Sequence, residues 1–144
     1  MKLLALNFLL TLSQFAFAGS TRYITCKGSH QNVFYETEVV MVSPDNINPL
    51  FSLDSISIYR KKGQDSQYSE SHYFSQDKLH TKGNKICSEA GCPKGHTVGN
   101  KNFLYYSPKK GKKASVKFYD EKINKLIDQR FSQCNDFTES EIQL

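Results

Sequence analysis

Four cysteines constrain this 144-residue chain more than any other feature of its sequence: Cys26, Cys87, Cys92 and Cys134. An even number of cysteines behind a secretion-type N-terminus indicates two disulfide bonds, and four cysteines allow three pairings. We favour Cys26–Cys134, which joins the two ends of the chain, together with Cys87–Cys92, which closes a small loop. On the chain-entropy model the longer loop contributes about 4–5 kcal/mol to stability, enough to decide whether a small domain folds.

The N-terminus is typical of a secretory signal peptide. Lys2 precedes an apolar stretch over residues 3–12, and small residues follow in the sequence Ala-Phe-Ala at 16–18. The stretch is too short, and too often interrupted by polar residues, to span a membrane. We therefore expect a signal peptide over residues 1–18 and a secreted protein, extracellular or, in a Gram-negative bacterium, periplasmic. After cleavage we expect a monomer without membrane association.

The rest of the chain favours strands over helices. Alanine is scarce there, whereas aromatic and β-branched residues are abundant. Apolar and polar side chains alternate over residues 33–42 and 51–59, which is the period of a strand with one buried face. Residues 123–131 fit either a strand or a short helix. Shorter predicted strands cover residues 22–27, 102–106 and 115–119.

These patterns predict a mainly β protein: a small single domain with a disulfide-stabilised antiparallel sheet, either ribonuclease-like or a sandwich or barrel. An α+β fold with one short helix is the alternative. We place the domain at residues 19–137 and a flexible acidic tail at residues 138–144. Turns are expected at residues 60–63 and 109–113. Recurring glycines predict an irregular loop over residues 78–102.

Positive charge is concentrated in one part of the chain. Residues 78–117 contain ten lysines and one acidic residue, Glu89, whereas acidic residues outnumber basic ones over residues 19–77 and 118–144. Such a segment indicates a polyanionic partner, with RNA as the first candidate. The alternative is a solvated lysine-rich loop that only keeps the protein soluble.

Aromatic residues next to the lysines suggest a surface for single-stranded nucleic acid. Lysines neutralise phosphates, and tyrosine rings stack on bases. The alternative for the two tyrosines is that one faces the core and the other is solvated. The candidate binding residues are Tyr105, Tyr106, Lys109, Lys110, Lys112, Lys113 and Lys117.

The sequence predicts neither a metal nor a cofactor. His80, Cys87, Cys92 and His96 could together bind zinc, but their spacing matches no common zinc finger, and secretion favours oxidised sulfur. The motifs Gly-x-Ser-x-Gly and His-Glu-x-x-His and a phosphate-binding glycine loop are absent from the sequence.

Several short segments resemble motifs of one family. Tyr23 and Cys26 lie near the expected mature N-terminus, residues 71–76 read Ser-His-Tyr-Phe-Ser-Gln, and Leu-Tyr-Tyr-Ser-Pro at 104–108 precedes Ala-Ser-Val-Lys-Phe at 114–118. With the basic β-rich body and the near-terminal cysteine, this layout is similar to the secreted microbial ribonuclease and ribotoxin superfamily, particularly the ribonuclease-like effectors of fungal plant pathogens. Those effectors carry an aromatic-x-Cys signature whose cysteine pairs with one near the C-terminus. Here the tyrosine and the cysteine are one residue further apart.

The resemblance implies a degenerate ribonuclease site. It places His72 at the family's first catalytic histidine, Tyr106 in place of the glutamate base, and Ser115 in place of the phosphate-binding arginine. The second catalytic histidine has no counterpart, because no histidine follows His96. Cleavage of RNA through its 2′-hydroxyl needs a base, an acid and a cation at the phosphate, so we expect no catalysis.

The leading hypothesis is therefore a secreted, non-enzymatic binding protein, a ribonuclease-like effector that engages host RNA or a host protein through its lysines. An active secreted ribonuclease that uses His72 is one alternative. The other is an unrelated secreted or periplasmic β-sandwich or barrel with an unknown ligand, in which the lysines are incidental.

Overall fold

The computed structural model describes residues 18–63, 67 and 70–140. All of the expected signal peptide except Ala18 lies outside these residues. The described chain is mainly β, as predicted. None of its helical segments has the length and apolar composition needed to span a membrane. Its elements are β1 (Ser20–His30), β2 (Val33–Ser43), β3 (Ser52–Lys62), β4 (Glu70–Ser75), the 3-10 turn η1 (Gln76–Lys78), β5 (His80–Lys82), β6 (Lys85–Cys87), β7 (Leu104–Lys109), β8 (Lys113–Asp120), β9 (Lys125–Phe131) and β10 (Gln133–Ser140).

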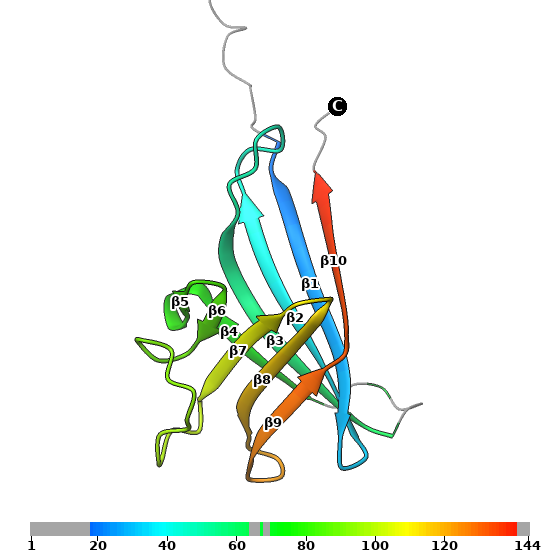
Figure 1. Ribbon diagram of the computed structural model, residues 1–144, viewed down its shortest axis with the longest axis vertical. Helices are drawn as coiled ribbons and strands as arrows, with labels where there is room; N and C mark the ends of the chain where they lie inside the picture. Colours follow the sequence, from blue (N-terminus) through cyan, green and yellow to red (C-terminus); the bar gives the residue numbers. More distant parts are fainter. Residues whose placement is uncertain (1–17, 64–66, 68–69, 141–144) are drawn as a thin grey trace, which may run out of the picture.

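The strands form two five-stranded antiparallel sheets (Figure 1). Sheet A has the strand order β10-β1-β2-β3-β4, and sheet B has the order β5-β6-β7-β8-β9. The chain crosses between the sheets at both pairs of edges, through η1 from β4 to β5 and through Ser132 from β9 to β10. These short connections hold the two sheets face to face.

Alternation along the strands decides which side chains fill the space between the sheets. Tyr35 and Val39 of β2 are buried, and so are Ala114, Val116 and Phe118 of β8. They belong to the larger buried cluster, which has members from both sheets, so the described residues form a single domain. The rings of Tyr35 and Phe118 meet edge to face across the sheets, with centroids 5.4 Å apart.

A glycine allows β1 to approach β9 closely. A Cβ atom at Gly28 would lie 2.8 Å from Nε2 of Gln129 and 2.9 Å from Cδ1 of Phe131. Both distances are too short for a real Cβ atom, so a larger residue would displace these two side chains of β9.

Both favoured disulfide bonds are confirmed. Cys26 of β1 and Cys134 of β10 lie directly opposite each other in the strand pairing and form one bond. Cys87 at the end of β6 bonds to Cys92, five positions along the chain.

Several predicted boundaries are wrong because strand pairing extends further than local sequence indicates. The predicted turn at residues 60–63 lies mostly in β3, which pairs with β2 as far as Lys62 opposite Val33. Residues 138–140 were expected in a flexible tail, but they belong to β10 and pair with the first residues of β1. The remaining tail residues, 141–144, lie outside the described residues. The segment expected to be a strand or a short helix is the strand β9.

Asp120 ends β8 as a fully buried carboxylate. The hydroxyl of Tyr35 donates a hydrogen bond to its Oδ2 at 3.0 Å, and Nε of Arg60 lies 3.6 Å from the same oxygen. A buried charge is tolerated only with such partners. Asp120 therefore ties β8 of sheet B to β2 and β3 of sheet A.

The two disulfides are expected to differ in their contribution to stability. Replacing Cys26 and Cys134 together with alanine should lower the free energy of unfolding by about 5 kcal/mol, whereas replacing Cys87 and Cys92 should lower it by about 2 kcal/mol, because the loop closed is much shorter. Urea denaturation of the two double variants measures both losses. Equal losses would contradict this account.

The buried carboxylate gives a second stability prediction. Asp120→Ala removes the carboxylate that accepts the hydrogen bond of the buried Tyr35 hydroxyl and lies beside Arg60, and it should cost about 3–5 kcal/mol in the free energy of unfolding. The control is Asp128→Ala, which removes an exposed carboxylate 3.5 Å from Lys117. That surface change should cost only about 0–1 kcal/mol. Similar costs for both variants would show that Asp120 has no special structural role.

Candidate functional site

The outward face of sheet B gathers basic side chains around two small ones. Because side chains alternate along β8, Lys113, Ser115 and Lys117 point away from the core. The pairing with β7 sets Lys109 opposite Lys113 and Ser107 opposite Ser115. The short side chain of Ser115, with long cationic side chains around it, leaves a hollow.

This hollow, the outer groove, has a volume of about 440 Å³. Asp128 supplies a negative charge at its edge, and it is paired with Lys117 at 3.5 Å. The positive charges therefore exceed the negative ones, and the groove can hold anionic groups. Its polar and basic lining includes Lys94, Lys109, Lys113, Ser115, Lys117 and Arg130.

The turn between β7 and β8 carries the other candidate lysines, Lys110 and Lys112, both exposed. Gly111 and Lys112 have positive φ angles of 73° and 56°, a conformation that glycine adopts freely and lysine does not. The backbone N–H of Cys134 donates to the carbonyl oxygen of Lys112 at 2.9 Å. This bond holds the basic turn against β10.

The two candidate tyrosines do not face solvent. Tyr106 is 2% exposed and belongs to the core between the sheets, and Tyr105 is 5% exposed and packs with Phe103 and the Cys87–Cys92 disulfide. This burial argues against base stacking by either ring, although Tyr105 lines the outer groove and Tyr106 lines a second hollow between the sheets. The alternative is right for Tyr106, which faces the core, but Tyr105 is not solvated.

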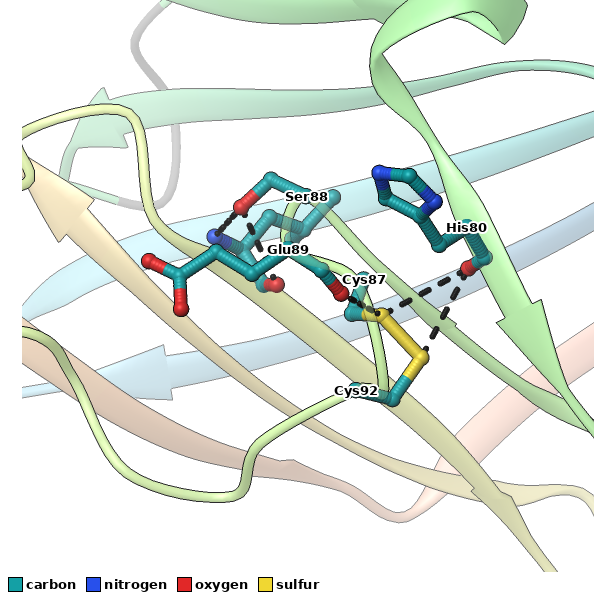
Figure 2. The surroundings of a disulfide bond; sticks show 6 residues. His80, Cys87, Ser88, Glu89 and Cys92 are labelled. Carbon is teal, nitrogen blue, oxygen red and sulfur yellow. Dashed lines mark hydrogen bonds between the residues drawn. A yellow bond between two sulfur atoms is a disulfide. The ribbon is translucent and has the colours of Figure 1, made fainter.

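A disulfide and two hydrogen bonds fasten the loop that covers Tyr105 (Figure 2). The N–H of Ser88 donates to the carbonyl oxygen of Leu104 at 3.0 Å, and the N–H of Leu104 donates to the Ser88 hydroxyl at 2.8 Å. The sulfur atoms of Cys87 and Cys92 are bonded to each other, and both lie 3.6 Å from the carbonyl oxygen of His80. Sulfurs held in this way do not provide the thiolates of a zinc site.

The described part of the chain contains no group of three or more histidine, cysteine, aspartate or glutamate side chains placed to hold a metal ion. The histidines are instead distributed over different surfaces. His80, on β5, is exposed.

His72 and His96 lie on opposite sides of β8. The ring of His72 on β4 faces Phe118 between the sheets, with centroids 5.8 Å apart, and its Nε2 is buried without a hydrogen-bond partner in the described structure. The ring of His96 stacks on Tyr119 at 5.7 Å, on the outward face. The structure does not bring these two imidazoles together as an acid–base pair.

Arg22 and Asp136 form a two-point ion pair between β1 and β10. Arg22 donates from Nε to Oδ1 at 2.9 Å and from Nη2 to Oδ2 at 2.5 Å. The hydrogen bonding lowers the pKa of Asp136 and raises that of Arg22. Both groups are partly exposed, and sequence reasoning gave no sign of the pair because its members are 114 positions apart.

Burial of Tyr106, with a smaller effect from the charge of Asp136, raises the pKa of the tyrosine from 10.0 to about 12. The folded protein thus keeps a proton that the unfolded chain loses, so this contribution to stability is complete below about pH 10 and is lost as the pH rises towards about 12.

Tyr106→Phe should reduce, by about 1 kcal/mol, the decrease in the free energy of unfolding that the protein shows between about pH 9 and about pH 11. Urea denaturation at both pH values tests this. Tyr73→Phe, at an exposed tyrosine, is the control, and an equal effect there would refute the prediction.

Comparison of the chain with protein-family models, curated proteins and solved structures finds no match. The candidate function therefore rests on the residues and the geometry described above.

Proposed function

We propose that this protein is a secreted, non-enzymatic binding protein whose outer groove binds the phosphate backbone of single-stranded RNA. The observation that carries the proposal is the strand register. It sets Lys109, Lys113 and Lys117 on one face around Ser115, with Arg130 on the neighbouring strand. Lys113 and Lys117 are four residues apart on β8, a distance of about 13 Å along the strand, so their charges reach more than one phosphate.

The chemistry of the groove favours recognition of phosphates over recognition of bases. Tyr105 and Tyr106 are buried and offer no ring for stacking, while the exposed cations can neutralise any backbone sequence. Binding of this kind is independent of base sequence and weakens steeply with salt. The two disulfides fit an oxidising compartment such as the extracellular space.

A binding role is preferred to cleavage because of the place of the histidines. His72 faces the core side of β8, whereas His96 lies on its outward side. A host RNA is thus the preferred partner of a protein that resembles ribonuclease-like effectors but does not cleave its ligand.

The test is a titration of the oxidised protein into fluorescent single-stranded RNA between about 50 and about 200 mM salt, followed by anisotropy. The triple variant Lys94→Gln, Lys117→Gln and Arg130→Gln should bind more weakly, and the slope of log affinity against log salt should fall by about 2. The matched control removes three other exposed lysines through Lys78→Gln, Lys101→Gln and Lys122→Gln.

The control variant should keep most of the slope, because these lysines do not line the groove. Equal losses in both triple variants would show that only net charge matters and would overturn the proposed site. Shortened RNA on a gel would favour the ribonuclease alternative, which His72→Ala would then test.

A further inference from the structure

A second hollow lies between the sheets. Sheet A extends beyond sheet B at this end of the molecule (Figure 1). This inner cavity has a volume of about 440 Å³. Its floor is the inner face of β1, β2 and β3, and its walls are the hairpin turns β5–β6 and β7–β8. The volume is within the range of about 300–1,000 Å³ found for small-molecule sites.

The floor of the inner cavity is apolar but incompletely covered. Ile24, Met41 and Leu53 are only partly buried, although they pack against the core, whereas Val39 and Ile86 beside them are buried. A free apolar face of this kind gains stability when an apolar group covers it.

A β-bulge makes this floor apolar. Val40 of β2 pairs with Ser55 of β3, and the register then shifts so that Met41 pairs with Leu53. Without the shift, Asp54 would stand opposite Met41. The bulge therefore replaces a carboxylate with a leucine at the cavity floor, as bulges do where a side chain must be redirected.

The rim of the inner cavity is cationic. Lys85 comes from the β5–β6 hairpin, and Lys109, Lys112 and Lys113 come from the β7–β8 hairpin. The acid among the described lining residues is Asp136, which Arg22 already neutralises. The rim therefore attracts a negative charge, while the floor takes an apolar chain.

We propose that the inner cavity binds a small amphipathic carboxylate: a single aliphatic chain lies on Ile24, Met41 and Leu53, and the head group lies among the rim lysines Lys85 and Lys112. This site is separate from the outer groove, since neither Lys85 nor Lys112 lines that groove. The inference does not depend on RNA binding.

The test is calorimetric titration of the oxidised protein with dodecanoate below its micelle concentration, with methyl NMR as the second readout. Dodecanoate should shift the methyl signals of Met41, Ile24 and Leu53, and its binding should show a negative heat-capacity change. Dodecanol, which lacks the charge, and acetate, which lacks the chain, should each bind at least about tenfold more weakly.

Two sets of variants locate the site. Met41→Trp fills the cavity and should weaken dodecanoate binding at least about tenfold, whereas Val42→Trp, the same change at the exposed neighbour on the opposite face of β2, should leave it unchanged. Lys85→Gln with Lys112→Gln changes two side chains at the rim. This variant should weaken dodecanoate binding. Lys85→Gln alone, at a residue outside the outer groove and outside the candidate RNA-binding residues, should leave RNA binding intact.

Absence of shifts at the three methyl signals would overturn the proposal, as would equal effects of Met41→Trp and Val42→Trp. Equal affinity for dodecanol and dodecanoate would overturn the role of the lysines. The variant of Lys94, Lys117 and Arg130 should bind dodecanoate normally, so failure of RNA binding and failure of this proposal are distinguished.

Discussion

The covalent bond between Cys26 and Cys134 determines where the two sheets meet. It holds the start of β10 opposite the middle of β1, and β9 of the other sheet ends only one residue before β10 begins. Cys134 also donates its backbone N–H to the carbonyl oxygen of Lys112, and this hydrogen bond anchors the β7–β8 turn. A bond that stabilises the core thus also fixes the position of the basic turn.

β8 shows how one strand serves both stability and binding. Its inward residues Ala114, Val116 and Phe118 fill the core, and its outward residues Lys113 and Lys117 line the outer groove. The inward side is held to sheet A by packing and by the buried carboxylate at the end of the strand. Because those contacts fix the backbone, the outward lysines keep their spacing without contacts to each other. Lysines that repel one another can therefore remain close on this surface.

Sequence alternation was sufficient to predict the long strands β2 and β3 and the mainly β class, because each has one apolar face. It could not reveal β10, which is mostly polar and pairs with β1, or β4, where the buried Phe74 stands among polar residues and the strand pairs with β3. The lysines of the groove were found by their concentration along the chain. The burial of Tyr105 could not be predicted in the same way, because it depends on a loop that begins at the distant Cys87. Arg130 and Lys94 were missed since only the register and the loop path bring them to the groove.

The outer groove and the inner cavity share Lys109 and Lys113, which lie where β7 ends and β8 begins. At this end of sheet B, one side of the hairpin faces solvent and the other faces the uncovered part of sheet A. The lysine charges of the hairpin therefore act on both the outer groove and the inner cavity. Each charge is felt over about 8–10 Å before salt screens it. An anion in either site lowers the positive potential at the other, and this coupling is reciprocal. The concentration of lysines in one turn thus links the two proposed sites, the outer groove for phosphates and the inner cavity for an amphipathic carboxylate.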